Sequence, residues 1–412
     1  RDVYKRQLQD QPVPQSPTQS AQQAQQAQQA QPAAQAAGAP PAAAAQNASR
    51  PAPVMSSDVF TWKPPAGAAG AHYCLLLNMS VCSASSALSA GGGFLLVVYN
   101  PLSWSYERGV TIPVEPGSYT LTGPDGKEVP SQLLPVSEAE EHAWQHDQDA
   151  LPEKVVKPTV QLAAVVSAPP LGHAVYKVES RAGGGRGGAA ESAVKPAGGP
   201  QTLSSGKLDV VVDASKGGIA SVARAGGKPQ AFMTDLLLYS KNVPMRSGAY
   251  TFTAEQPPDS LGKPKVTVVT GPVVQEVRQD FEAAGVLVTR LWKGAEQLEV
   301  RWTVGPPPSG RNYEIFLRYS TAIKSMGVWW TDANGREFQQ RKRNYRPAFQ
   351  LNAQGLPANI YPVTTGAFLE DAGSRLSVAI DRAQGAATMD DGQLQINLHR
   401  ASVTDDAKGM EE

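Results

Sequence analysis

The feature that most constrains the fold is a strict alternation of polar and apolar side chains from Gln297 to Val304, in the order Q-L-E-V-R-W-T-V. Every even position of this stretch is apolar and every odd position is polar. A period of two is typical of a strand that buries one face, whereas an amphipathic helix repeats about every 3.6 residues. No helical period is sustained along the chain. The sequence therefore predicts an all-β protein built from antiparallel sheets.

Short apolar runs bounded by Gly, Pro, Asn and Asp continue this pattern from Asp58 onward and predict further strands. The predicted strands are Phe94–Tyr99, Val110–Val114, Tyr119–Thr122, Val160–Val166, Ala174–Val178, Leu208–Val212, Val266–Val269, Val273–Phe281, Val286–Trp292 and Leu298–Val304. Turns are predicted at Pro124-Asp125-Gly126 and Asp391-Gly392. The pair Asn334-Gly335, which follows Trp329 and Trp330, predicts a type I′ hairpin. The acidic residues 137–157 are expected to form a helix or an excursion loop.

Two low-complexity segments divide the chain. Residues 1–57 are dominated by Gln, Ala, Pro and Ser. They contain few bulky side chains whose burial could offset the entropy of ordering, so we expect a disordered linker. Residues 181–200 are rich in Gly and Ala and indicate an inserted loop or a second linker. We therefore expect a small β-sandwich domain over residues 58–180 and a large, C-terminally truncated β-sandwich domain over residues 201–412.

The charge balance excludes several classes of function. Lys and Arg together number 37, as do Asp and Glu, so the chain has no electrostatic footprint for nucleic acid or an acidic membrane surface. It contains no apolar run of about 18 residues, and no transmembrane helix is predicted. The chain begins at Arg1 rather than at Met and ends at Glu412 in a charged stretch. We expect it to be a fragment of a longer protein.

One group of residues has the spacing of metal ligands. His142 and His146 are four residues apart, with Asp147 and Asp149 nearby. On a helix, two His at this spacing share one face, as in some zinc sites. The segment is polar and the sequence fixes no further ligand elsewhere, so a solvated surface is the favoured interpretation.

A basic segment, Arg341-Lys342-Arg343-Asn344-Tyr345-Arg346, sets a tyrosine among cations. Such a mixture can bind single-stranded nucleic acid by stacking and charge. The neutral chain argues against this function. The sequence also contains no serine elbow, phosphate-binding loop or dinucleotide fingerprint.

The two cysteines, Cys74 and Cys82, lie on either side of Asn78-Met79-Ser80, which is an N-glycosylation sequon. They could form a disulfide that closes a short loop, which persists only in an oxidising compartment. They could equally be two unrelated thiols. A second sequon begins at Asn47 in the Gln- and Ala-rich tract.

Several longer motifs are distinctive. They are V-V-Y-N-P-L-S-W at Val97–Trp104, S-K-N-V-P-M-R-S-G-A-Y at Ser240–Tyr250, the stretch Ser320–Pro347 that contains the Trp pair and the basic segment, and the end of the chain. Together they resemble the C-terminal β-domains of lysosomal-type α-mannosidases, glycoside hydrolase family 38. The resemblance extends from about residue 73 to residue 412.

The resemblance implies a small β-sandwich followed by a large, galactose-mutarotase-like super-sandwich. It also implies a retaining, zinc-dependent α-mannosidase that acts on terminal α-D-mannose of N-glycans, with mannose-containing glycans and the N-terminal catalytic domain as partners. In the family, the nucleophile and the His and Asp ligands of the zinc lie in that catalytic domain. The H-H-D-A motif expected before the first β-domain is absent here. This chain therefore offers no counterpart of a nucleophile or zinc ligand.

Two residues correspond to family positions that reach the sugar pocket. Tyr250 resembles a tyrosine whose hydroxyl bonds near the mannose, although an ordinary strand tyrosine is the alternative. Arg400 follows the Asp391-Gly392 turn, and simple alternation places it on the face of Leu394, Ile396 and Leu398, where a charge needs a partner. The resemblance makes that partner the pocket or the catalytic domain.

The resemblance also implies a Cys74–Cys82 disulfide, a glycan on Asn78, and a location in the secretory pathway, in the lysosome or vacuole or outside the cell. The same implied fold would also suit a non-catalytic secreted β-sandwich that binds carbohydrate or a protein partner, or a β-scaffold without a ligand.

Overall fold

The structure is a computed structural model. It describes residues 80–86, 91–147, 159–181, 188–241, 257–305, 312–351 and 355–401, with the single residues Cys74, Leu77 and Ala254. The chain divides into two units, residues 1–65 and 66–412, and every described residue belongs to the second. The low-complexity tract, Asn47, Asn78 and Tyr250 lie outside the described residues.

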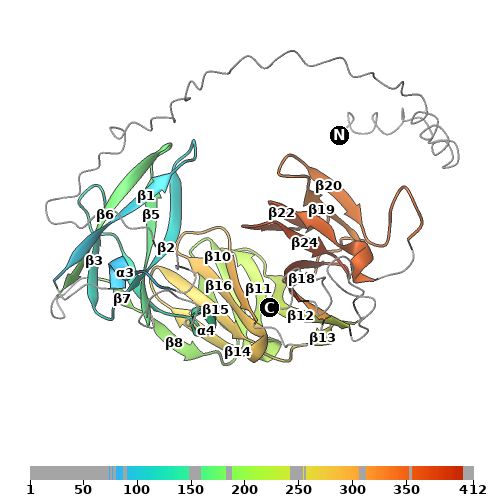
Figure 1. Cartoon of the computed structure of the whole chain (residues 1–412), viewed down its shortest axis with the longest axis horizontal. Helices are drawn as coiled ribbons and strands as arrows, with labels where there is room; N and C mark the ends of the chain where they lie inside the picture. The colour runs from blue at the N-terminus through green and yellow to red at the C-terminus, as the bar shows by residue number, and fades with distance from the viewer. Residues whose placement is uncertain are drawn as a thin grey trace, which may run out of the picture. The chain divides into compact units, whose positions relative to one another are not determined.

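The first part of the described chain is a small β-sandwich, coloured blue to green in Figure 1. One sheet contains β1 (Gly93–Asn100), β6 (Gly172–Arg181) and β3 (Ser118–Thr122), in that order. The other contains β2 (Tyr106–Val114), β5 (Val160–Ala168), β4 (Ser131–Pro135) and β7 (Ala190–Glu191). Leu121 and Val178 from the first sheet pack with Leu133 and Leu162 from the second, and all four are almost fully buried. This arrangement confirms a β-sandwich in this part of the chain.

Three further sheets follow. The nine-stranded sheet contains β21 (Tyr361–Val363), β24 (Gln384–Ala387), β25 (Gln393–Ala401), β18 (Asn312–Thr321), β12 (Gln230–Lys241), β11 (Gly218–Arg224), β10 (Leu208–Asp213) and β9 (Gln201–Ser204), with β13 (Asp259–Ser260) beside β12. The five-stranded sheet contains β17 (Glu299–Val304), β16 (Gly285–Trp292), β15 (Val274–Asp280), β14 (Lys265–Thr270) and β8 (Ala193–Pro196). The four-stranded sheet contains β20 (Phe338–Lys342), β19 (Val328–Asp332), β22 (Gly366–Glu370) and β23 (Arg375–Ala379). The described strand pairings in these three sheets are antiparallel, so the all-β expectation is confirmed.

A continuous apolar core joins these three sheets. Leu317 of the nine-stranded sheet, Leu287 of the five-stranded sheet and Trp329 of the four-stranded sheet belong to one buried cluster. The small sandwich is attached through a second contact, in which Leu134 and Ala163 pack with residues of the five-stranded sheet. The sheet that contains β5 is therefore covered on both faces, which is why β5 is apolar along most of its length.

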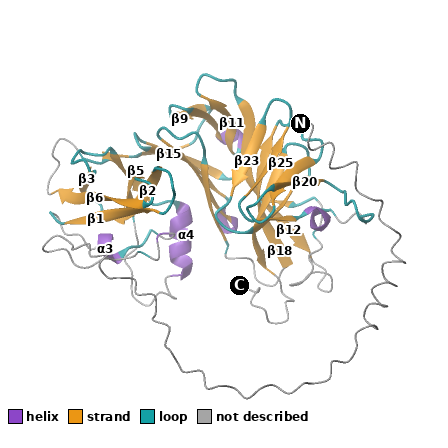
Figure 2. Ribbon diagram, turned by 90° about the horizontal axis from the view of Figure 1, so that it is seen from above, coloured by secondary structure: helices purple, strands orange, loops and turns teal. Residues whose placement is uncertain are grey.

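Helices are short in the described residues. They are α3 (Ser83–Ser86), α4 (Glu138–Asp147) and the 3₁₀ turns η3 (Ala214–Lys216), η5 (Glu282–Ala284) and η6 (Leu356–Asn359). The acidic segment for which a helix or a loop was expected thus begins as a helix. Glu140 supplies one half of a capping box at the start of α4, because its carboxylate accepts the Ser137 backbone N–H at 2.7 Å. Figure 2 shows α4 as the longest purple helix, and its residues contact β16 and β17.

The predicted hairpin turn is confirmed. Asn334 and Gly335 have φ values of 54° and 71°, and the Arg336 N–H donates to the Ala333 carbonyl at 3.1 Å. Positive φ at both central residues defines a type I′ turn. Asp332 supports the turn by accepting the Gly335 N–H at 2.8 Å.

The described part of the predicted linker, residues 188–200, carries two short strands. Strand β7 pairs with β4, the one parallel pairing among the described strands, and β8 pairs antiparallel with β14. The segment therefore adds a strand to the small sandwich and another to the five-stranded sheet. Neither A-E nor A-V-K-P has a period that marks it as a strand.

Candidate functional site

Arg400 lies on β25 directly opposite Glu314 of β18. The Arg400 Nε is 3.2 Å from Glu314 Oε1, and the Asn397 side-chain amide donates to Glu314 Oε2 at 2.8 Å. The side chain of Glu314 is 5% exposed and that of Arg400 is 25% exposed. The three residues form an ionic cluster, hereafter the Arg400 cluster, with a buried carboxylate and a more accessible guanidinium.

A β-bulge determines which face of the sheet carries the cluster. Ile315 pairs with His399, but the next residue, Phe316, pairs with Asn397, so Leu398 is an extra residue in β25. Because a bulge shifts the alternation by one residue, Arg400 shares a face with Asn397 and not with Leu394 and Ile396. The expectation that Arg400 lies on the face of Leu394 and Ile396 is therefore wrong. Its ion-pair partner is Glu314 of this same chain.

Burial controls the charge of Glu314. It raises the pKa of the Glu314 carboxyl to about 7, although the Arg400 guanidinium and the Asn397 amide both lower it. Desolvation thus outweighs the neighbouring charge. The carboxyl changes its charge within the physiological range of pH, which is unusual for glutamate.

Tyr239 of β12 lies opposite Glu314 on the other side of β18. Its hydroxyl donates to Gln395 Oε1 at 2.8 Å, and its ring meets that of Phe316 edge-on, with centroids 5.2 Å apart. The Arg400 cluster is thus set into a packed, partly aromatic face. Tyr250 is outside the described residues, and its role in a sugar pocket stays a prediction.

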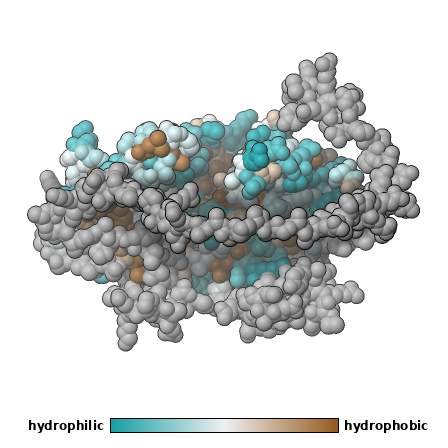
Figure 3. Space-filling view, turned by 45° about the horizontal axis from the view of Figure 1, so that its top comes forward, coloured by the Kyte–Doolittle hydropathy of each residue, from teal (hydrophilic) through white to brown (hydrophobic). Residues whose placement is uncertain are grey.

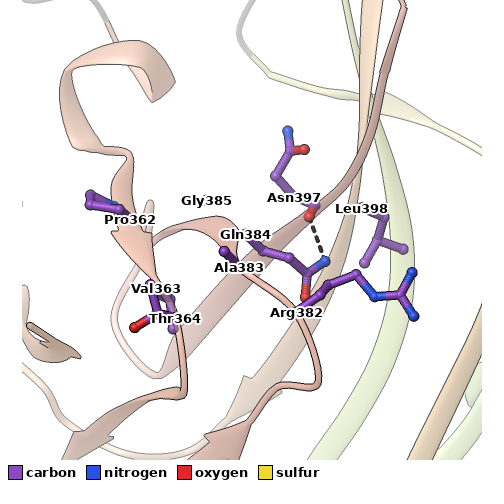
Figure 4. Close-up of a pocket in the computed structure, with 9 residues that line it drawn as sticks. All are labelled: Pro362, Val363, Thr364, Arg382, Ala383, Gln384, Gly385, Asn397 and Leu398. Atoms are coloured by element: carbon purple, nitrogen blue, oxygen red, sulfur yellow. Dashed lines mark hydrogen bonds between the residues drawn. The ribbon is translucent and has the colours of Figure 1, made fainter. Parts of the chain in front are cut away.

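A shallow pocket of about 410 Å³ opens beside the cluster, between β21, β24 and β25 (Figure 4). Strands β24 and β25 pair only at Ala386–Ile396 and Ala387–Gln395. The Gln384 side-chain amide then reaches across to donate to the Asn397 carbonyl at 2.8 Å. The pocket lies where β25 approaches its bulge. It is lined by Pro362, Val363, Thr364, Arg382, Ala383, Gln384, Gly385, Asn397 and Leu398.

The described residues do not provide a zinc site. Among them, no group of three or more His, Cys, Asp or Glu side chains is placed to hold a metal ion. His142 lies on α4, whereas the side chains of His146 and Asp147, and all of Asp149, are outside the description. The zinc implied by the resemblance therefore does not fit the described side chains.

The basic segment contacts the protein itself. The guanidinium groups of Arg341 and Arg346 each lie 4.4 Å from the ring centroid of Tyr361. Arg343 pairs with Asp391 at 3.4 Å. These cations thus hold β20 and the following loop against β21 and the β24–β25 turn, through cation–π contacts and one ion pair.

Strand pairing also creates a buried ionic network that the sequence did not reveal, hereafter the Glu276 network. Glu276, which is fully buried, contacts Arg290 Nε at 2.5 Å and Arg278 at 2.7 Å. Glu140 of α4 lies 3.6 Å from Arg290 and 3.2 Å from Arg301. Burial would raise the pKa of Glu140, but the Arg290 and Arg301 charges hold it below its usual value. Alternate charges in V-Q-E-V-R-Q-D of β15 are the sequence signal for these inward-facing ions.

Cys74 and Cys82 are joined in a disulfide, with Cα atoms 5.2 Å apart. The alternative of two unrelated thiols is thereby removed. Hydrophilic side chains cover most of the described surface visible in Figure 3, with small hydrophobic patches between them. None of the described helices has the length and apolar character needed to cross a membrane.

Comparison with known proteins assigns this chain to a protein family. Residues 203–408 match the family described as glycosyl hydrolases family 38 C-terminal domain. The fold and this match define the β-sandwich region of a glycoside hydrolase. More particularly, the chain belongs to glycosyl hydrolase family 38.

Its relatives include an alpha-mannosidase of Arabidopsis thaliana, 33% identical over 353 residues, which cover 82% of this chain and 34% of the relative. The lysosomal alpha-mannosidase of Homo sapiens is 30% identical over 365 residues, covering 82% and 33% of the two chains. A crystal structure of an alpha-mannosidase from Enterococcus faecalis aligns with a TM-score of 0.46 and 12% identity, over 75% of this chain and 40% of that one. The chain thus spans about a third of the length of the first two relatives.

Proposed function

We propose that this chain is the C-terminal β-portion of a retaining, zinc-dependent α-mannosidase that releases terminal α-D-mannose from N-glycans of glycoproteins. The observation that carries the proposal is the family match over residues 203–408, together with relatives named alpha-mannosidase that align over 82% of the chain. Mannose-containing glycans would be the substrates, and the N-terminal catalytic domain of the same enzyme would be the partner.

In this proposal the nucleophile, the acid/base carboxylate and the zinc ligands belong to that catalytic domain. Bound zinc would supply Lewis-acid contact to sugar hydroxyls there. The β-portion contributes Tyr250 and Arg400 to the rim of the sugar pocket. The partly exposed Arg400 guanidinium carries fixed N–H donors, which suit the hydroxyl oxygens of a sugar.

The proposed location is the secretory pathway, in the lysosome or vacuole or outside the cell, with glycans on Asn78 and Asn47. The Cys74–Cys82 disulfide supports it, because such bonds persist in oxidising compartments. The similarity to a human relative named lysosomal alpha-mannosidase also supports it.

A second candidate is a non-catalytic β-sandwich that binds carbohydrate by itself. The pocket of about 410 Å³ favours it, because Thr364, Gln384 and Arg382 bring a hydroxyl, an amide and a guanidinium to its lining. The two candidates differ in whether the isolated chain binds sugar. Binding of mannose oligosaccharides that is lost in Gln384→Ala would favour the second candidate.

The test of the first candidate is an enzyme in which this sequence follows the catalytic region of an α-mannosidase. We expect one zinc ion per chain and hydrolysis of an aryl α-mannoside with net retention of the anomeric configuration. NMR of the released sugar measures that configuration. A stable, zinc-loaded protein without α-mannosidase activity would contradict the proposal. A matched control carries the natural β-region of the same enzyme.

A further inference from the structure

Glu314 divides its two carboxylate oxygens between two residues of β25. Oε1 lies 3.2 Å from Arg400 Nε, and Oε2 accepts the Asn397 side-chain N–H at 2.8 Å. Asn397 and Arg400 are three residues apart and would point to opposite faces of a regular strand. The extra residue Leu398 places them on one face, so one buried carboxylate can hold both.

We propose that Glu314 is a positioning residue for Arg400, and that protonation of Glu314 in acid releases the Arg400 guanidinium to bind the sugar. This inference rests on the proposed function, because it assigns regulation to the Arg400 corner of that sugar pocket. When ionised, Glu314 attracts the Arg400 guanidinium by charge and draws it away from the sugar. When neutral, it keeps its place beside Asn397 but no longer attracts the guanidinium by charge.

The surroundings of Glu314 leave Arg400 as its ion-pair partner among the described residues. Tyr239 faces Glu314 from β12, but its hydroxyl donates to Gln395. Arg318, on the same face of β18, is held by Asp235 through two contacts of 3.0 and 2.5 Å. His399 lies on the opposite face, against Tyr313.

The direction of the pH effect follows from burial. The pKa of the Glu314 carboxyl is raised to about 7, so the group is largely neutral in an acidic compartment and ionised in mildly alkaline solution. An acid-favoured release of Arg400 would suit an enzyme that works in a lysosome or vacuole. The strand pairing and the two contacts of Glu314 carry the mechanism, and burial sets the pH at which it acts.

The first test uses the complete α-mannosidase that contains this sequence, with an aryl α-mannoside as substrate. KM is measured from pH 5 to pH 8 for the parent enzyme and for Glu314→Gln, which mimics the neutral carboxyl. The ratio of the two KM values removes the titration of catalytic groups shared by both proteins. We expect similar KM values at pH 5 and a parent KM about tenfold higher than that of Glu314→Gln at pH 8, as for one lost bond to a charged donor. A ratio that does not change with pH would overturn the inference.

Two further variants keep the test decisive. Arg400→Ala should raise KM at pH 5, where the guanidinium of the parent binds the sugar, and should change it little at pH 8; an unchanged KM at pH 5 would overturn the proposed role of Arg400 itself, rather than only its control by Glu314. Asn397→Ala removes a hydrogen bond that lowers the pKa of Glu314, so the KM transition should move to higher pH. An unmoved transition would show that another group titrates.

The second test uses the present chain alone and does not depend on activity. The folded-state pKa of Glu314, about 7, lies above the ordinary value of 4.5. The stability that this group contributes is therefore fully present below pH 4.5 and is lost as the pH rises through 7. We expect the melting temperature of the parent chain to fall between pH 5 and pH 8 relative to Glu314→Gln.

Glu296→Gln is the matched control for this second test. Glu296 is exposed, and its hydrogen bond and ion pair with Lys207 lower its pKa. Its effect on stability should therefore lie below pH 5, outside the tested window. The inference would be overturned if the difference in melting temperature between the parent and Glu314→Gln stayed constant from pH 5 to pH 8.

Discussion

The Arg400 cluster joins an almost fully buried anion to a partly exposed cation, so the two partners have unequal effects when removed. Loss of Arg400 leaves the Glu314 charge in a site that is 5% exposed. An uncompensated buried charge is costly, because the carboxylate has lost its hydration without gaining a counter-charge. At residue scale the cluster therefore serves both the stability of β18–β25 pairing and the proposed sugar pocket.

Tyr250 and Arg400 can be compared in a full-length enzyme. Tyr250→Phe removes one hydroxyl and keeps the ring, so kcat/KM should fall several-fold, or about 1 kcal/mol, with little change in stability. At pH 8, where Glu314 is ionised, Arg400→Ala should lower the free energy of unfolding by about 3 kcal/mol, because it removes the counter-charge of a buried carboxylate. Kinetics and melting temperature are measured on the same preparations. Wild-type values of both quantities in both variants would mean that neither residue contributes to the sugar pocket.

The position of Arg400 shows what the sequence could predict about the site. The sequence predicted that Arg400 needs a partner, and the resemblance made that partner the pocket or the catalytic domain, whereas the structure pairs Arg400 with Glu314. The face predicted for Arg400 was wrong because the bulge at Leu398 arises from pairing between β18 and β25, and no local residue pattern marks it. Glu314 itself was missed, since N-Y-E-I-F-L-R-Y-S-T shows a lone acid whose partner is over eighty residues away.

At the scale of elements, the Glu276 network connects α4 to the five-stranded sheet. Glu276 and Arg290 are buried on neighbouring strands, and Glu140 brings the first turn of α4 to the same place. Arg278 also donates to the Val136 and Pro135 carbonyls just before α4, at 3.2 and 2.6 Å. The helix is thus tied to the sheet by charges whose removal from water is compensated within the network.

This arrangement predicts that two Glu→Gln substitutions differ widely in their effect on the stability of the chain. Glu276→Gln should destabilise the chain by about 3–5 kcal/mol, because Arg278 and Arg290 would keep their buried charges without their main counter-ion. Glu296→Gln breaks an ion pair with Lys207 on the exposed surface, and stability should hardly change. Equilibrium unfolding in urea measures both. Equal midpoints for the two variants would show that the buried network contributes no more than a surface pair.

Elements defined by local chemistry were predictable, and those defined by distant partners were not. The type I′ turn requires positive φ at two adjacent residues, which Asn334-Gly335 supplies. Strand β17 follows from its own alternation. Strands β7 and β8, in contrast, exist because β4 and β14 offer free edges, and their own residues carry no strand pattern. The pocket beside β24 likewise depends on where two strands separate.

At the scale of the whole molecule, this chain corresponds to about a third of the relatives that it matches. The Cys74–Cys82 disulfide closes a loop that contains the Asn78 sequon. A loop of this size restricts the unfolded chain, with an entropic effect of about 2.5 kcal/mol. The loop therefore combines a structural crosslink with a candidate glycan site.

Expression in a secretory host tests this combination. We expect peptide maps under non-reducing conditions to show Cys74 joined to Cys82, and glycosidase treatment to remove a glycan from Asn78. Asn78→Gln is the control for the glycan, because it deletes the sequon and leaves both cysteines. Two free thiols and an unmodified Asn78 would contradict the proposed secretory location.

The last prediction concerns the zinc content and the activity of the isolated chain, which should differ from those of the enzyme in the proposed function. The described residues contain no group of three or more His, Cys, Asp or Glu side chains placed to hold a metal ion, and the proposed function assigns the nucleophile to the catalytic domain. The isolated 412-residue chain should therefore neither retain zinc in a one-to-one ratio after dialysis nor hydrolyse an aryl α-mannoside. Elemental analysis and a chromogenic assay measure the two properties, with a zinc-loaded α-mannosidase as positive control. One tightly bound zinc per chain, or turnover blocked by a mannosidase inhibitor, would show that the β-portion carries catalytic groups of its own and that the proposed division of roles is incorrect.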